Sequence, residues 1–162
     1  MPTVITVNAQ HFETLDLSPV KVVLENWLQT KTLFEGDRSL QFQIDYPQDP
    51  EQVLELPDIP EIRLWFVRLD SIYPWIPYWL DWTSGELARY AAMMVPHEFS
   101  KREGIQFNPQ ALDLFVMRKI FTIHHWFQQN GVSRPNRLKQ MADLFGYELE
   151  DSLFQLLDKH PA

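Results

Sequence analysis

The chain has 162 residues and a net charge of −8, from 14 Lys and Arg against 22 Asp and Glu, and it contains no cysteine. The lack of cysteine excludes disulfides, cysteine nucleophiles, thiolate zinc sites and cysteine-held iron–sulfur clusters, and the acidic balance argues against a general nucleic-acid-binding protein. A hydrophobic fraction of 45% is enough for one core, so we expect a single domain over residues 1–162.

The first 60 residues predict a strand, a helix and a second strand. Val4-Ile5-Thr6-Val7 is a β-branched run typical of a strand. Ser18-Pro19 begins a helix, with serine as the cap and proline in the first turn, and apolar residues follow at helical spacing as far as Leu28. Apolar and polar residues alternate over 40–46, as in a half-buried strand. The acidic, proline-rich stretch 47–60 is predicted to be a connector.

The middle of the chain predicts a third strand and a further helix. Residues 62–69 combine apolar, aromatic and β-branched residues, which suggests a central strand covered on both faces. A helix is expected to open at Ser84-Gly85-Glu86 and to run through Met94, ending before Pro96. Glu98 and Arg102 are four residues apart and suggest a charged pair on a short helical segment.

The last third of the chain predicts three helices. Asn108-Pro109 is a second cap-plus-proline start and Gly131 is a helix stop. The helix of about 20 residues between them is apolar nearly all round, which is typical of a central core helix. Shorter helices are expected over 136–145 and 149–158. The fold class is therefore α+β, a small mixed or antiparallel sheet of about three strands packed by the long helix and several shorter ones.

Negative charge is concentrated in the first third of the chain. Residues 1–60 contain ten acidic and three basic residues, a balance of −7. Such a surface keeps a protein in solution, and it can also steer a basic partner. The sequence leaves both interpretations open.

Motifs for catalysis or metal binding are not apparent in the sequence. It has no glycine-rich phosphate loop, no G-x-S-x-G elbow and no H-E-x-x-H pair. His124 and His125 are adjacent, so on a helix they point about 100° apart and do not chelate one metal. We expect them at the surface or its boundary, and the sequence indicates no metal and no cofactor.

Aromatic residues are densest between residues 65 and 90, which hold four of the six tryptophans. Pro74 and Pro77 turn the chain twice within this segment. Such a turn does not easily bury every ring, and tryptophan and tyrosine dominate protein interfaces. The segment is therefore either a core beneath a loop or a surface that binds another polypeptide. On the second interpretation the partner-binding residues are Tyr73, Trp75, Tyr78, Trp79, Asp81, Trp82, Arg89 and His97.

Two other interpretations of this segment remain. His97, Glu98 and Asp81 would serve as titratable groups of a small enzyme with a cleft beside the aromatic residues. The rings would also suit reversible contact with a membrane surface, which the net charge of −8 opposes for anionic lipid. The most apolar run, 72–80, has nine residues and two prolines, far short of the roughly 20 that span a bilayer, so we expect no membrane insertion and an intracellular, soluble protein.

Several runs of the sequence resemble the chlororespiratory-reduction-six family of cyanobacteria and chloroplasts. They are Leu64-Trp-Phe-Val-Arg-Leu-Asp70, Tyr73-Pro-Trp-Ile-Pro77, Asp81-Trp82, Gly85-Glu-Leu-Ala-Arg-Tyr90, Val95-Pro-His97 and Phe107-Asn-Pro-Gln-Ala-Leu112. The resemblance implies a non-catalytic assembly factor for the photosynthetic type I NAD(P)H dehydrogenase complex. It also implies contact with the ferredoxin-like iron–sulfur subunit and hydrophilic-arm subassemblies, and release before the complex is mature.

The resemblance places such a protein in the cyanobacterial cytosol, or in the chloroplast stroma for plant relatives. It supplies no catalytic residues for this chain. Because the chain has no cysteine, we expect it to act on the polypeptide of the iron–sulfur subunit rather than to carry its cluster.

Overall fold

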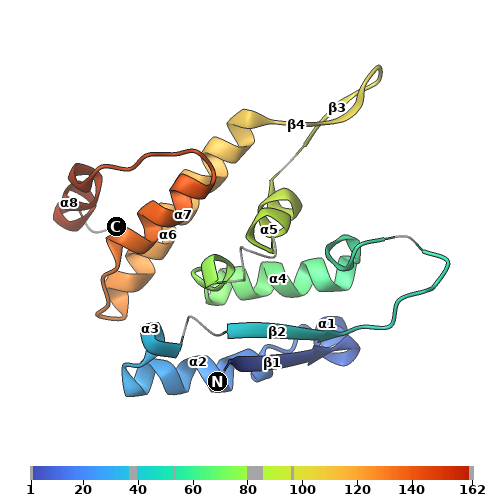
Figure 1. Cartoon of the computed structure of the whole chain (residues 1–162), viewed down its shortest axis with the longest axis horizontal. Coiled ribbons are helices and arrows are strands. Elements are labelled where there is room, and N and C mark those ends of the chain that lie inside the picture. Colours follow the sequence, from blue (N-terminus) through green and yellow to red (C-terminus); the bar gives the residue numbers. More distant parts are fainter. Residues whose placement is uncertain (1, 37–39, 53, 80–85, 96, 161–162) are drawn as a thin grey trace. The chain divides into compact units, whose positions relative to one another are not determined.

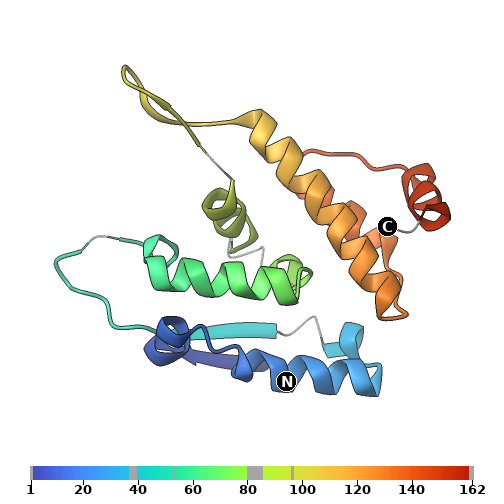
Figure 2. The ribbon, with the colours of Figure 1, turned by 180° about the vertical axis from the view of Figure 1, so that it is seen from behind.

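The computed structural model describes residues 2–36, 40–52, 54–79, 86–95 and 97–160. These form a mixed α/β arrangement in two compact units, 1–93 and 94–162 (Figures 1 and 2). A single domain over the whole chain stays a prediction. No helix in the described ranges is both long and apolar enough to cross a lipid bilayer.

The first unit is built on two parallel strands. β1 (Thr3–Asn8) pairs with β2 (Leu40–Asp45) in a register that begins at Thr3 and Leu40. Both strands were predicted, but the pairing is parallel, because three helices carry the chain from the end of β1 back to the start of β2. These helices are α1 (Ala9–Thr14), α2 (Ser18–Thr30) and α3 (Leu33–Gly36).

Polar side chains accept backbone N–H groups at the starts of α1 and α2. The side chain of Asn8 accepts a hydrogen bond from the backbone N–H of His11, and His11 Nδ1 accepts one from the N–H of Asn8. This capping pair explains α1, which the sequence did not predict. The helix α2 begins at the predicted Ser18, but serine is its first residue and Leu17 is in the cap position. The carboxylate of Asp16 accepts the Ser18 N–H at 2.9 Å.

The predicted third strand over 62–69 is wrong, because this segment lies within a helix, α4 (Pro60–Ile72). Its buried residues Ile62, Trp65 and Leu69 recur at helical spacing, and Pro60 occupies the first turn. The ring of Trp65 packs edge-on against Phe12 of α1 and Phe42 of β2. Within the part of the chain that the structure describes, the predicted sheet of about three strands is therefore not found, and a helix packs on a two-stranded sheet instead.

Shorter helices lie before and after α4 in the sequence. The 3₁₀ helix η2 (Leu56–Asp58) precedes α4 within the predicted connector, and η3 (Ile76–Trp79) comes after it. The next helix, α5 (Glu86–Met94), lies within the predicted helix, whose opening positions 84 and 85 are outside the described residues.

The second unit begins with a hairpin and continues as helices. β3 (His97–Ser100) and β4 (Gly104–Phe107) pair antiparallel, so the predicted helical pair of Glu98 and Arg102 is wrong. Gly104, with φ at +79°, allows the left-handed turn that closes the hairpin.

The long predicted helix is confirmed as α6 (Pro109–Gln129), and Asn108 caps it by accepting the N–H groups of Gln110 and Ala111. The two last helices, α7 (Pro135–Leu144) and α8 (Asp151–Lys159), lie within two residues of their predicted bounds. Helix α7 packs on α6. The residues of α6 that form the core are Val116, Ile120, Ile123 and Phe127.

Candidate functional site

The structure divides the predicted partner-binding residues into groups. Tyr73, Trp75 and Tyr78 are buried in the first unit. Arg89 is exposed on α5. The prediction for Asp81 and Trp82 lies outside the described residues. For Trp79 and His97, only the position in the secondary structure is described. Trp79 is the last residue of η3, and His97 is the first residue of β3.

Burial of three rings favours the interpretation of the aromatic segment as core. Trp75 is 0% exposed, as is Trp65 of α4 at the start of the aromatic segment. Burial also raises the pKa of the Tyr78 hydroxyl well above its ordinary value, so it stays neutral. Tyr73, Trp75 and Tyr78 thus contribute to the core of the first unit, and their part in binding a partner stays a prediction.

The enzyme interpretation needs Asp81, His97 and Glu98 together. Asp81 is outside the described residues, and β3 carries the other two with Glu98 opposite Gln106 of β4. Within the described ranges, no three His, Cys, Asp or Glu side chains are grouped so that they would hold a metal ion. No specific observation favours an enzyme.

An apolar pocket lies within the first unit, beside the predicted residue Arg89. Its volume is about 210 Å³. Strand β2 places Phe42 and Ile44 on the same side as the buried Leu40, because side chains alternate along a strand. The other lining residues come from η2, α4 and α5, and they are Leu56, Pro57, Ile62, Phe66, Arg89, Tyr90 and Met93.

Aromatic packing shapes the pocket. The ring of Phe66 lies 6.4 Å from that of Phe42 and 6.3 Å from that of Tyr90, both edge-on. Burial raises the pKa of the Tyr90 hydroxyl, so its side of the pocket is uncharged. Among the described residues of the lining, Arg89 alone is charged, and it is exposed. The arrangement suits an apolar group that carries a negative charge at its edge.

The sequence did not predict this pocket, apart from Arg89. Its residues come from four segments between Phe42 and Met93, and each segment alone has an ordinary apolar pattern. The feature of the sequence that points toward the pocket is the position of Arg89 in α5, next to the aromatic Tyr90.

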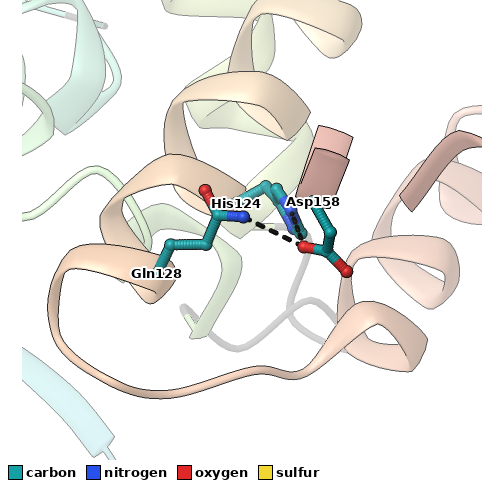
Figure 3. Close-up of polar contacts among 3 residues, drawn as sticks. All are labelled: His124, Gln128 and Asp158. Carbon is teal, nitrogen blue, oxygen red and sulfur yellow. Dashed lines mark hydrogen bonds and ion pairs between the residues drawn. The ribbon is translucent and has the colours of Figure 1, made fainter. Parts of the chain in front are cut away.

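A polar cluster joins α8 to α6 in the second unit (Figure 3). Asp158 Oδ1 lies 3.0 Å from His124 Nε2 and accepts a hydrogen bond of 2.9 Å from Gln128 Nε2. His124 is only 6% exposed, and its ring lies 5.7 Å from that of the buried Phe154. The expectation that His124 lies at the surface is therefore wrong, because α8 covers it.

Replacing Asp158 by alanine is expected to loosen α8. The change removes the acceptor of His124 and Gln128 and leaves a buried ring nitrogen without its carboxylate, which costs about 1–3 kcal/mol. Amide hydrogen exchange over residues 151–159 should become at least several-fold faster, with little change in β1 and β2. Lys159→Ala, one residue further on the same helix, is the control, and equal exchange in the two variants would contradict the role of Asp158.

A comparison with models of protein families identifies the family of this chain. The family model described as Chlororespiratory reduction 6 matches residues 7–156. This match includes every run on which the predicted resemblance depends, so the resemblance is confirmed. No solved structure matches the chain.

Proposed function

Because the chain belongs to the chlororespiratory reduction 6 family, we propose that it is a non-catalytic factor that binds the ferredoxin-like iron–sulfur subunit of the photosynthetic NAD(P)H dehydrogenase-like complex. The family is linked to assembly of that complex. Family membership is the observation that carries the proposal. The contact takes place while the hydrophilic arm is being built, in the cyanobacterial cytosol or the chloroplast stroma, and it ends before the complex is mature.

The chemistry of the chain supports binding to a polypeptide. Without cysteine, the chain lacks the usual ligands of an iron–sulfur cluster, so its contribution to an iron–sulfur subunit is to the protein part. The first unit also has a strong electrostatic field. Residues 1–93 contain 14 acidic and six basic residues, a balance of −8, whereas residues 94–162 contain eight of each. Such a unit accelerates association with a basic surface of a partner.

The proposal is tested in a cyanobacterial strain that lacks the gene for this chain. We expect the amount of assembled complex to fall several-fold, and hydrophilic-arm subassemblies that contain the iron–sulfur subunit to be depleted. A tagged copy of the chain should restore the complex. It should also co-purify with the iron–sulfur subunit during assembly, and not with the mature complex.

One control and two possible outcomes make the test decisive. The membrane arm of the same complex should be synthesised normally in the deletion strain, since the proposed contact is with the hydrophilic arm. Unchanged levels of the mature complex in that strain would overturn the assembly role. Restoration of the complex by a tagged chain that captures other hydrophilic-arm subunits, and never the iron–sulfur subunit, would overturn the proposed partner.

A further inference from the structure

The apolar pocket of the first unit has room for one side chain. Its volume of about 210 Å³ exceeds the roughly 150 Å³ of an apolar cavity that accepts benzene. It is smaller than the roughly 300–1,000 Å³ of sites that hold drug-sized ligands. The lining is aliphatic and aromatic apart from Arg89. The pocket therefore matches a single aromatic or branched aliphatic group, which is the size of an anchor residue at a protein interface.

Arg89 gives the pocket a charge preference. It lines the pocket and is itself exposed, so it lies where the pocket opens to solvent, and no side chain that the structure describes forms an ion pair with it. Among the acidic residues next to lining residues in the sequence, Asp58 follows Pro57 and lies 3.9 Å from Arg63, which partly balances its charge. A guanidinium binds carboxylates in preference to neutral groups.

We propose that this pocket receives an aromatic or branched aliphatic side chain of a partner polypeptide, with an Asp or Glu next to it in the partner's sequence that pairs with Arg89. This inference rests on the proposed function, which supplies a polypeptide as the partner. The occupant is one anchor residue and its acidic neighbour, because the volume holds one apolar group and the mouth offers one cation.

The negative charge of the first unit limits the number of acidic residues that a bound partner segment can carry. The first unit has a balance of −8, so its long-range field attracts basic surfaces and opposes acidic ones. A carboxylate of the partner therefore gains binding energy only through direct contact with Arg89. The partner segment is therefore neutral or basic apart from the acid beside the anchor.

The test uses three short peptides, acetyl-Phe-Asp-amide, acetyl-Phe-Asn-amide and acetyl-Ala-Asp-amide, titrated into the isotope-labelled full chain. Chemical shifts should change in a saturable way at residues of β2, α4 and α5 around the pocket. The Asn peptide should bind about threefold more weakly than the Asp peptide, as expected for an exposed ion pair. The Ala peptide should bind at least tenfold more weakly, since it lacks the apolar anchor.

Variants of the chain separate the contribution of Arg89 to peptide affinity from the contribution of the apolar pocket. Arg89→Gln should make the Asp and Asn peptides bind equally, whereas Arg68→Gln, which changes an exposed arginine of α4 outside the pocket, should keep the preference. Ile44→Phe fills the pocket from β2, and Met93→Phe does so from α5 if the first variant does not fold. Either filled variant should lose at least tenfold in affinity for the Phe peptides.

The outcomes separate this inference from the proposed function. Equal affinity of the Asp and Asn peptides for the unmodified chain, or saturable shifts that map away from the pocket, would overturn the inference. An Arg89→Gln chain that restores the normal amount of complex in the deletion strain would overturn the pocket's part in assembly and leave the proposed function standing. A deletion without effect on the complex would overturn the proposed function, whatever the peptides do.

Discussion

Replacing Trp65 by alanine is expected to lower the free energy of unfolding by about 3–5 kcal/mol, a large part of the 5–15 kcal/mol typical of a natural domain. Trp65 is 0% exposed, and its ring centre lies 5.3 Å from that of Phe12 and 5.9 Å from that of Phe42. Its indole N–H also donates a 3.1 Å hydrogen bond to the backbone carbonyl of Asp16. One side chain thus connects α1, the segment before α2, β2 and α4. Urea denaturation followed by circular dichroism measures the loss.

The controls for Trp65 also test the helical assignment of this segment. Trp65→Phe keeps most of the apolar surface and loses the hydrogen bond, so it should cost about 1–3 kcal/mol. Val67→Ala should change stability by less than about 0.5 kcal/mol, because Val67 is 37% exposed on α4. A strand would bury Val67 on the same face as Trp65, since strand side chains alternate. A cost for Val67→Ala close to that for Trp65→Ala would therefore contradict the helix.

The error over residues 62–69 has an identifiable physical cause. This segment is rich in aromatic and aliphatic residues, which suit a strand and a buried helix equally well, and its length alone does not decide between them. Two local signals favoured the helix: Pro60 in the first turn, and the spacing of Ile62, Trp65 and Leu69. What fixes the outcome is the aromatic packing from α1 and β2, which comes from residues more than 20 positions away.

Helices with strong end signals were predicted well. The cap-plus-proline pattern located the starts of α2 and α6, and Gly131 lies just beyond the last residues of α6. Their length makes the apolar pattern unambiguous. The hairpin of β3 and β4 was missed because its strands have four residues each, too few for a period to show.

The candidate site was predictable only in part. A dense aromatic segment indicates that much apolar surface is buried or bound, but it does not indicate which. The structure buries Tyr73, Trp75 and Tyr78, so the rings contribute to the core of the first unit. Arg89 was found from the sequence because it is a charged residue close to those rings. The pocket beside it depends on tertiary contacts of Phe42 and Phe66, and no local pattern reveals them.

Replacing Lys119 by methionine is expected to stabilise the protein at neutral pH. Lys119 is 7% exposed on α6, and burial lowers the pKa of its ammonium group from 10.5 to about 8. Holding the charged form in the fold therefore costs up to about 3 kcal/mol at pH 7. Methionine has a similar shape without the charge, but it loses the contact of the ammonium with the Phe115 ring, 5.7 Å away. We expect a net gain of about 1–2 kcal/mol in urea denaturation at pH 7.

The pH dependence distinguishes the charge from simple packing. Between about pH 8 and 10.5 the unfolded chain binds more protons at Lys119 than the folded chain, so this residue makes stability rise with pH in that window. The advantage of Lys119→Met should thus be fully present below pH 8 and shrink toward zero as the pH approaches 10.5. Tyrosines that titrate at high pH are common to both chains and cancel in the difference. Arg118→Met, an exposed cation on the same helix, should show no such trend, and an advantage of Lys119→Met that is constant with pH would mean that shape, rather than the buried charge, causes it.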